Sequence, residues 1–417
     1  MEDQGSADAV RFKISRRDFL KFAGFAYMGV FASGCHERGK GMSTSLPGFS
    51  GSHEPVVMAA IPRGADAESV LAAIGQTAEA ATNFSWLSRG DTVFIKVVSN
   101  SANPYPATTS PLSVSGMVRL LKKKGAGRVI VGDKPGVQAV YQDGDGQKGS
   151  SRDVLVQNGL QQAALESGAQ VHYFEEPGFD AFFGDRTEHR GHWKGELLFP
   201  NILNHVDHIV LLPRVSRHAL AGTTLGLKAA VGWLRDDSRL ELHHDAATFY
   251  EKIAEINDAV VLRQKLRLVL SVATKVQTTF GPDKGFEAQP DPGLVLASES
   301  LLAHDMVSLG WLLWNREHHT PPADLTWYRD PHITYPGMMN RIFVGMIWGM
   351  GSFFTAGTYT HIPLRSVRTD PVISRAAVLW GGFPRLELVD VNRTLPEDIA
   401  RYLKEKAADP ELHKGLT

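Results

Sequence analysis

Two apolar strands separated by one helix constrain the fold of this 417-residue chain. Residues 91–98 are mostly apolar and predict a buried strand, and residues 128–133 predict a second one. Between them a helix begins near Pro111 and ends near Lys124, before two glycines. A strand, a helix and a strand at this spacing form neighbouring parallel strands with a right-handed crossover. The pattern therefore predicts an α/β protein.

The same alternation continues along the chain. Further strands are predicted at residues 56–61, 170–174, 205–213, 266–272 and 294–297. We expect two α/β lobes with mainly parallel sheets and a ligand cleft between them. The predicted domains are an N-terminal α/β domain at 56–258, a C-terminal α/β domain at 259–395 and a polar helical tail at 396–417.

Charge and cysteine content exclude several classes of protein. The net charge of −1 provides no overall field that would attract nucleic acid, so no nucleic-acid partner is expected. The chain has one cysteine, which excludes a disulfide framework and an iron–sulfur cluster, since a cluster needs about four thiolates.

The N-terminal segment resembles a twin-arginine export signal, because residues 15–21 read S-R-R-D-F-L-K. The apolar run at 22–34 is shorter than the about 20 residues that a membrane span takes. Cys35 follows Ala32-Ser33-Gly34, which resembles a lipoprotein processing site, and simple cleavage nearby is the alternative. We therefore expect a signal peptide at 1–35, lipidation of Cys35 and a flexible tether at 36–55.

These features predict an exported protein, periplasmic or otherwise extracytoplasmic, with the twin-arginine export machinery as a partner. A lipid on Cys35 would hold the protein at the membrane surface. The resemblance also implies export in the folded state, often with a cofactor already bound.

Residues 218–244 contain a histidine, a lysine and a terminal pair of histidines that could form a catalytic site. His218 follows the predicted strand at 205–213, where open α/β sheets place ligand chemistry, and Lys228 comes ten positions later. The segment ends on His243 and His244. These residue types could form a catalytic site: a histidine that titrates near neutrality to move protons, a lysine as nitrogen nucleophile and a second histidine as metal ligand. The alternative is a helix cap, a solvated lysine and two surface histidines.

Three other stretches are weaker candidates for a metal site or a membrane contact. The pairs His189/His192 and His205/His208 have zinc-like spacing, but the second pair lies on a predicted strand, where residues three apart face opposite sides. The apolar, glycine-rich run at 342–354 is expected to be core, with a membrane-facing patch as the alternative.

Several of these stretches together resemble domain-of-unknown-function family 362. The matching positions are Ile95-Lys96, Thr108-Thr109-x-Pro111, 125–133, 207–213, His218, Thr224-x-x-x-Lys228-x-x-x-Gly232, His244, 281–285 and 297–305. The chain departs from the family pattern at Ser216, where a lysine is common, and at Ala229, where an asparagine is usual.

A more distant similarity links residues 218–244 to the nickel-pincer-nucleotide lactate racemase family. The resemblance implies that His218 is a catalytic acid/base, that Lys228 is joined covalently to the pincer cofactor, and that His244 ligates nickel, with His243 as the competing ligand. Asn100 and Asn103 stand where that family has Asp and Arg. Arginine binds a carboxylate through two parallel hydrogen bonds, and asparagine cannot.

We therefore expect an exported cofactor-dependent enzyme with racemase, epimerase or hydride-transfer chemistry on a small hydroxy acid or sugar-like substrate. The catalytic candidates are His218 and Lys228, and the metal candidates are His244 and His243. The cofactor-binding candidates are Lys228, Lys96, Asn100, Thr109 and Asp133. The cofactor would be a nickel-pincer nucleotide or a single transition metal. The alternative is a metal-binding or redox-accessory lipoprotein without catalysis.

Overall fold

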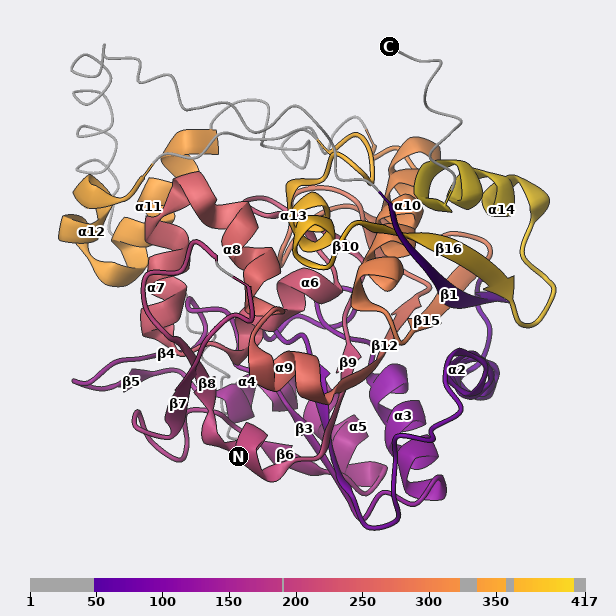
Figure 1. Cartoon of the computed structure of the whole chain (residues 1–417), viewed down its shortest axis with the longest axis horizontal. Helices are drawn as coiled ribbons and strands as arrows, with labels where there is room; N and C mark the ends of the chain where they lie inside the picture. Colours follow the sequence, from indigo (N-terminus) through magenta and orange to yellow (C-terminus); the bar gives the residue numbers. More distant parts are fainter. Residues whose placement is uncertain (1–48, 190, 323–335, 358–363, 409–417) are drawn as a thin grey trace, which may run out of the picture. The chain divides into compact units, whose positions relative to one another are not determined.

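One large sheet organises the computed structural model, which describes residues 49–189, 191–322, 336–357 and 364–408. Its eight strands lie side by side in the order β16 (Phe383–Asp390), β1 (Phe49–Ile61), β15 (Gly293–Ser298), β12 (Leu266–Ala273), β9 (His208–Leu212), β2 (Thr92–Val97), β3 (Arg128–Gly132) and β6 (Gln170–His172) (Figure 1). Only β15 runs against the others, since it is antiparallel to both β1 and β12. The predicted α/β class and mainly parallel sheet are confirmed.

The remaining elements surround this sheet. The helices are α2 (Ala67–Ala81), α3 (Pro111–Lys123), α4 (Ser151–Gln157), α5 (Leu160–Glu166), α6 (Gly226–Ala229), α7 (Asp236–His244), α8 (Phe249–Ile256), α9 (Val260–Lys265), α10 (Leu301–His318), α11 (Pro336–Trp348), α12 (Met350–Thr355), α13 (Pro371–Leu379) and α14 (Glu397–Leu403). A small sheet joins β11 (Gly222–Thr224), β10 (Ser216–His218), β13 (Val276–Gln277) and β14 (Glu287–Ala288). Two hairpins pair β4 (Tyr141–Gln142) with β5 (Gln147–Lys148) and β7 (Phe182–Asp185) with β8 (Leu197–Pro200).

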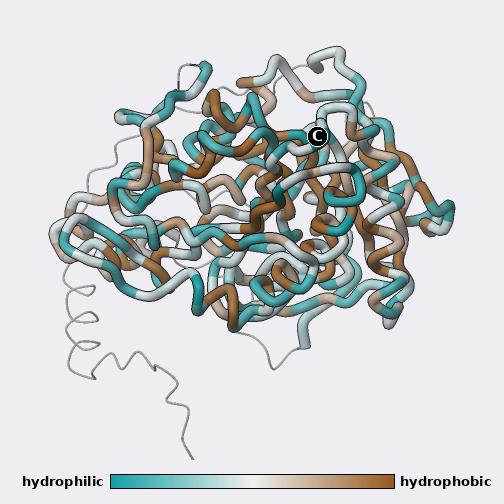
Figure 2. Tube along the Cα trace, turned by 90° about the horizontal axis from the view of Figure 1, so that it is seen from below, coloured by the Kyte–Doolittle hydropathy of each residue, from teal (hydrophilic) through white to brown (hydrophobic). Residues whose placement is uncertain are grey.

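The strands are apolar on both sides because helices cover both faces of the sheet. In β1, Val57 belongs to the hydrophobic cluster that includes residues of α2 and α3, whereas Met58 belongs to the cluster that includes residues of α8, α10 and α13. In β2, Ile95 belongs to the same cluster as Val57, and Phe94 belongs to a third cluster. In Figure 2, brown hydrophobic stretches of the chain accordingly lie in the middle of the molecule. The expected near-continuous apolar strands follow from this two-sided burial.

Two expectations about domain organisation differ from the structure. Strands from both predicted lobes, β2 and β12 among them, lie in the same sheet, so the lobes do not have separate sheets in the described residues. The flexible tether predicted at 36–55 is wrong for residues 49–55, because β1 already begins at Phe49 and pairs in parallel with β16. The signal segment at 1–35 and Cys35 lie outside the described residues.

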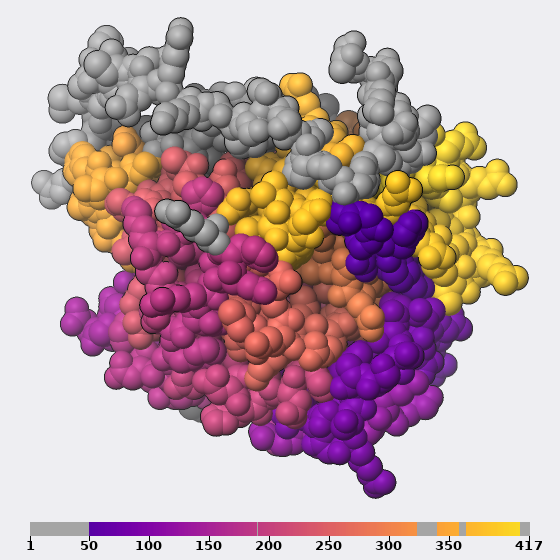
Figure 3. All heavy atoms as spheres, viewed as in Figure 1, coloured from indigo at the N-terminus to yellow at the C-terminus, as the bar shows by residue number. Residues whose placement is uncertain are grey.

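The apolar run at 342–354 is mostly surface rather than core. It forms most of α11 and α12, in which Val344 is buried while Met346, Met350 and Phe354 are 47%, 41% and 62% exposed. These two helices lie at the upper left of the space-filling view (Figure 3). None of the helices among the described residues is long and apolar enough to cross a membrane.

The carboxyl ends of β2, β3 and β9 meet at one edge of the sheet, because these parallel strands are neighbours. The chain continues from them into residues 98–100, 133–136 and 213–215, which are wholly or largely buried. This edge is where open parallel sheets present side chains to a ligand.

The packing beneath that edge can be tested at Phe94, which is fully buried against Phe174 and Trp233. We expect Phe94→Ala to lower the free energy of unfolding by about 3–5 kcal/mol, because it leaves a cavity in the core. The matched change Phe354→Ala removes the same ring from an exposed position and should stay within about 0.5 kcal/mol. Equal effects in chemical denaturation would contradict the assignment of these two sites.

Candidate functional site

A pocket of about 400 Å³ lies at this edge of the sheet. Its polar lining consists of Asn100, Asp133, Lys134, Arg214, Thr224, Lys228 and Arg239. Three of these, Asn100, Asp133 and Lys228, are among the site residues expected from the sequence. The pocket is therefore the part of the molecule in which to examine those expectations.

A buried ion pair holds the floor of the pocket. The Lys96 ammonium donates to Asp133 Oδ1 at 2.5 Å and to the carbonyls of Val97 and Ala229 at 3.0 and 3.1 Å. The other oxygen of Asp133 accepts from the backbone N–H and hydroxyl of Ser99 at 2.7 and 3.0 Å. All three ammonium protons and both carboxylate oxygens are thus satisfied, which a buried pair requires. Lys96 itself does not line the pocket; Asp133 does.

Gly232 lies directly against this ion pair, in the 3₁₀ turn η2 (Ala230–Trp233) that follows α6. A Cβ atom at this position would lie 2.1 Å from Asp133 Oδ1 and 2.5 Å from the Lys96 nitrogen. No side chain fits there, so the glycine lets the chain after Lys228 pass against the pair.

Two further expected residues have mainly structural contacts. The Thr109 hydroxyl donates to the Leu212 carbonyl at 2.5 Å and accepts from the Val98 N–H at 2.8 Å, so it joins the ends of β9 and β2. It is fully buried and does not line the pocket. Asn100 does line it, and its side-chain amide donates to Asp283 Oδ1 at 2.7 Å.

Asp305 in α10 positions the helix that carries Lys228. Its carboxylate oxygens accept from the backbone N–H groups of Gly226 and Leu227 at 2.8 and 2.7 Å, at the first turn of α6. A carboxylate at a helix N-terminus satisfies amides that otherwise have no partner. Asp305 therefore orients the backbone from which the Lys228 side chain extends.

The Lys228 amine is the most unusual titratable group of the pocket. It forms no hydrogen bond or ion pair with any described residue, and it lines the pocket wall. Burial, reinforced by the charges of Arg214 and Arg239, lowers the pKa of Lys228 to about 7. A large fraction of this amine is therefore neutral at neutral pH, which is the state that acts as a nucleophile or base.

His218 is buried beside the pocket, at the end of β10. Its Nδ1 accepts from the N–H groups of Leu220 and Ala221, both at 3.1 Å, so this nitrogen is unprotonated and any ring proton lies on Nε2. Burial, followed by the charge of Lys228, holds the pKa of His218 well below its usual value of about 6.5. The expected histidine that titrates near neutrality is therefore not found at His218, and Lys228 has that property instead.

His243 lies one helical turn after the pocket residue Arg239 in α7, so the two residues share a face of that helix. Its ring packs against Phe249 and Phe343 with centroids 5.3 and 4.7 Å apart. The Asn340 amide donates to the His243 carbonyl at 2.7 Å, and its oxygen lies 3.4 Å from His243 Nδ1, which must donate. The other ring nitrogen then keeps its lone pair. Burial, followed by the Lys228 charge, lowers the pKa of His243 to about 3.

His244 points elsewhere. Its Nε2 lies 2.9 Å from the hydroxyl of Thr355 in α12, and its side chain is 34% exposed. Consecutive helical residues point in directions about 100° apart, so only one of the two histidines can face Lys228. The nickel-ligand role expected for His244 does not fit this position, whereas the competing candidate His243 shares the electrostatic environment of His218 and Lys228.

Sequence reasoning missed three cations of the pocket. Lys134 donates to Asp236 at 2.6 Å, and Arg239 donates to the carbonyls of Pro135 and Lys134 at 2.5 and 2.9 Å. Arg214 follows β9 after a single proline and is 1% exposed. A charged residue two positions after a buried strand, as at Lys134 and Arg214, was the available signal.

Three of the four histidines in the zinc-like pairs contact carboxylates. His189 and His192 lie 3.0 and 2.6 Å from buried oxygens of Asp258 and Glu255, and His208 lies 3.0 Å from Asp91. Within the described ranges, no three histidine, cysteine or acidic side chains gather in a way that could hold a metal ion.

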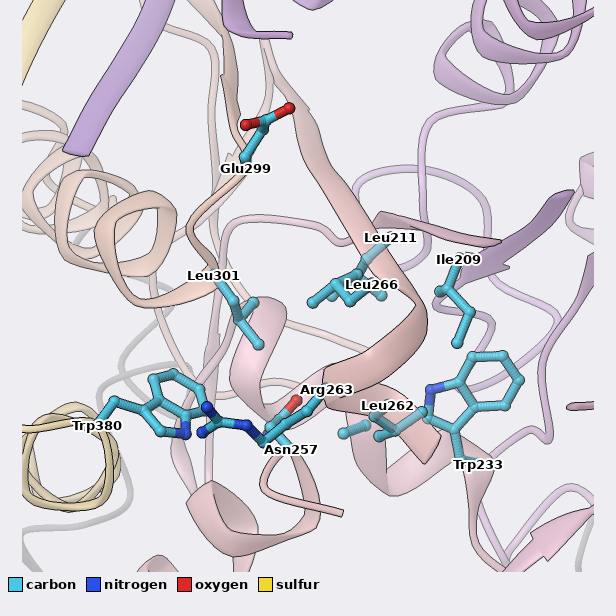
Figure 4. A pocket seen from close by; sticks show the side chains of 11 residues that line it. Ile209, Leu211, Trp233, Asn257, Leu262, Arg263, Leu266, Glu299, Leu301 and Trp380 are labelled. Carbon is cyan, nitrogen blue, oxygen red and sulfur yellow. The ribbon is translucent and has the colours of Figure 1, made fainter. Parts of the chain in front are cut away.

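A larger pocket, of about 750 Å³, lies elsewhere against β9 and β12. Figure 4 shows its mainly apolar lining, with Trp380 beside Arg263. Arg263 is paired with Glu188 and Asp258 at 2.8 and 3.2 Å. None of the site residues expected from the sequence lines this pocket, so it does not compete with the Lys228 pocket for that role.

The fold and this site can now be compared with known proteins. The family model for Domain of unknown function (DUF362) matches residues 93–310, which include β2, the pocket and most of α10. The chain belongs to this family, as its sequence pattern predicted. No curated protein matches the chain in sequence.

Two solved structures align with parts of this chain. A crystal structure of a protein from Thermotoga maritima aligns with a TM-score of 0.40 at 13% identity, over 60% of this chain and 59% of that one. The lactate racemase apoprotein from Thermoanaerobacterium thermosaccharolyticum aligns with a TM-score of 0.32 at 14% identity, over 57% and 53%. The alignments thus span less than two thirds of either relative.

The contact between Gly232 and the ion pair gives a direct test of the pocket floor. We expect Gly232→Ala to lower the free energy of unfolding by about 1–3 kcal/mol, because the added methyl group overpacks the buried pair. As a control, Gly75→Ala places a methyl group in open space on α2 and should stabilise by up to about 1 kcal/mol. An unchanged stability for Gly232→Ala in denaturant titrations would refute the close contact.

Proposed function

We propose that the chain is an enzyme that acts on a small molecule at the Lys228 pocket. The observation that carries this proposal is the half-buried Lys228 amine on the pocket wall, which has a pKa lowered to about 7 and no partner among the described residues. Keeping a lysine in this state costs folding free energy, since the charged form is disfavoured and no local contact offsets the cost. Such groups concentrate at sites that need a neutral amine.

We further propose that the reaction is a racemisation, an epimerisation or a related hydride transfer. The support is the sequence resemblance of residues 218–244 to the nickel-pincer-nucleotide racemases, in which the matching lysine carries the cofactor. When bound, that group supplies a site that accepts and returns hydride. In this chain Lys228 would be its covalent anchor, and His243, with one unprotonated ring nitrogen, would be the metal ligand.

The residues fit that group in part. Lys228 has a free amine on the pocket wall, as a covalent anchor requires, and His243 offers a neutral imidazole. His244 does not fit, because its ring is engaged with Thr355. The ring proton of His218 lies on Nε2, since Nδ1 accepts from two backbone N–H groups.

The metal-binding accessory function expected as the alternative has less support. A protein site for a single transition metal uses several side-chain ligands, and the described residues contain no cluster of three. Export remains part of the proposal on the strength of residues 15–21 and Cys35, which lie outside the described residues.

The covalent anchor can be tested by mass spectrometry of the protein purified from its native host. We expect the tryptic peptide that contains Lys228 to carry an adduct, and elemental analysis to find nickel in the same preparation. Lys228→Ala should lose both. An unmodified Lys228 peptide in nickel-free protein would exclude the pincer cofactor, and metal that survives Lys228→Ala but is lost in His243→Ala would favour the accessory function.

The titration of Lys228 gives a second test, on protein without a cofactor. Only the neutral amine reacts with acylating reagents, and a lowered pKa means that this form is present above about pH 7. Labelling of the Lys228 peptide should therefore rise through pH 7 and level off near pH 8. Arg214→Met should move the midpoint to higher pH, because it removes a nearby positive charge, whereas Arg263→Met in the other pocket should not. A midpoint near pH 10 in the wild type would remove the basis of the proposal.

A further inference from the structure

One edge of the Arg214 guanidinium has no protein partner. Its Nη1 donates to the Pro106 carbonyl at 3.1 Å. Nε and Nη2 are buried and have no acceptor among the described residues. These two nitrogens form the side of the guanidinium that presents two parallel N–H groups, the geometry that matches the two oxygens of a carboxylate.

Other unused donors line the same pocket. The Thr224 hydroxyl and Arg239 Nε are buried without a partner in the described part of the chain. The Lys228 amine adds a further donor. A buried donor that lacks an acceptor destabilises the folded state, so an acceptor placed among these donors would be bound favourably.

The charges around the pocket favour an anion. Asp133 is paired with Lys96, and Asp236 with Lys134. This leaves Arg214, Arg239 and Lys228, with Asp283 as the remaining carboxylate close enough to act on Arg214. Asp283 also accepts from Asn100. Positive charge therefore exceeds negative charge where the donors converge.

The backbone argues for a carboxylate over a phosphate group. Phosphates in α/β proteins are usually held by free N–H groups at a helix N-terminus. The first N–H groups of α6, at Gly226 and Leu227, already donate to Asp305. The donors that remain are a planar fork, a hydroxyl and an amine, which suit a planar anion with two oxygens.

We propose that Arg214 binds the carboxylate of a small organic acid through Nε and Nη2, with Thr224 and Lys228 beside it. This assignment rests on the proposed function, since it names the substrate class of the same pocket. It also accounts for Asn103, which stands where the racemase family has an arginine. Arg214, from the end of β9, supplies the fork that Asn103 cannot.

Calorimetry with glycolate tests the assignment on the full chain. Wild-type protein should bind glycolate, and Arg214→Lys should weaken binding by about tenfold or more, because lysine keeps the charge but loses the second parallel hydrogen bond. Arg263→Lys is the matched control in the larger pocket and should bind as the wild type does. No binding by the wild type, or equal affinities for Arg214→Lys and wild type, would overturn the proposal.

A second variant and a second ligand complete the experiment. Thr224→Val keeps the shape of the side chain and removes the hydroxyl, so it should weaken glycolate binding even where Arg214→Lys proves unstable in thermal unfolding. Inorganic phosphate should bind more weakly than glycolate, and the reverse order would overturn the carboxylate assignment. These measurements need no cofactor, so an unmodified Lys228 would refute the proposed reaction while leaving the binding result interpretable.

Discussion

The buried pair of Lys96 and Asp133 is the contact on which the functional edge of the sheet depends. It joins β2 to the residue that follows β3, and through the Ala229 carbonyl it also holds the turn after Lys228. Both groups are fully hydrogen-bonded, so the pair is tolerated in a region that excludes water. The pair also requires a glycine at position 232, since any side chain there would collide with both charged groups. Three segments distant in the sequence thus meet around one internal salt bridge.

The pair also shapes the electrostatics above it. Because Asp133 is committed to Lys96 and Asp236 to Lys134, neither carboxylate forms a salt bridge with Lys228, Arg214 or Arg239. Burial lowers the pKa of Lys228, and the charges of Arg214 and Arg239 add to the effect, so that this pKa falls to about 7. Burial alone lowers the pKa of Arg214 to about 10, against the opposing charge of Asp283. Burial is thus the first cause of the lowered pKa of both the Lys228 amine and the Arg214 guanidinium.

The fold class and the family could be predicted from local patterns. Two-sided burial makes the strands 91–98, 266–272 and 294–297 apolar enough to recognise in isolation. Two lobes were expected because nothing in the sequence states which strands are neighbours; β1 and β15 join the halves through pairings some 240 residues apart. At the site, spacing identified Lys228 but not the choice between His243 and His244, which depends on the rotation of α7. Arg214 was missed because its proposed role depends on the absence of acceptors for its Nε and Nη2 within the described residues. No local sequence pattern indicates such an absence.

The contact between Asp305 and the first turn of α6 has a consequence for how the pocket meets its ligand. α10 has 18 residues and is mostly buried, so the carboxylate that holds α6 is itself attached to a helix in the hydrophobic core. The lysine backbone has little freedom to follow an incoming molecule. The pocket should therefore be preorganised: the Lys228 amine keeps its position when a ligand binds, and the ligand adjusts to it.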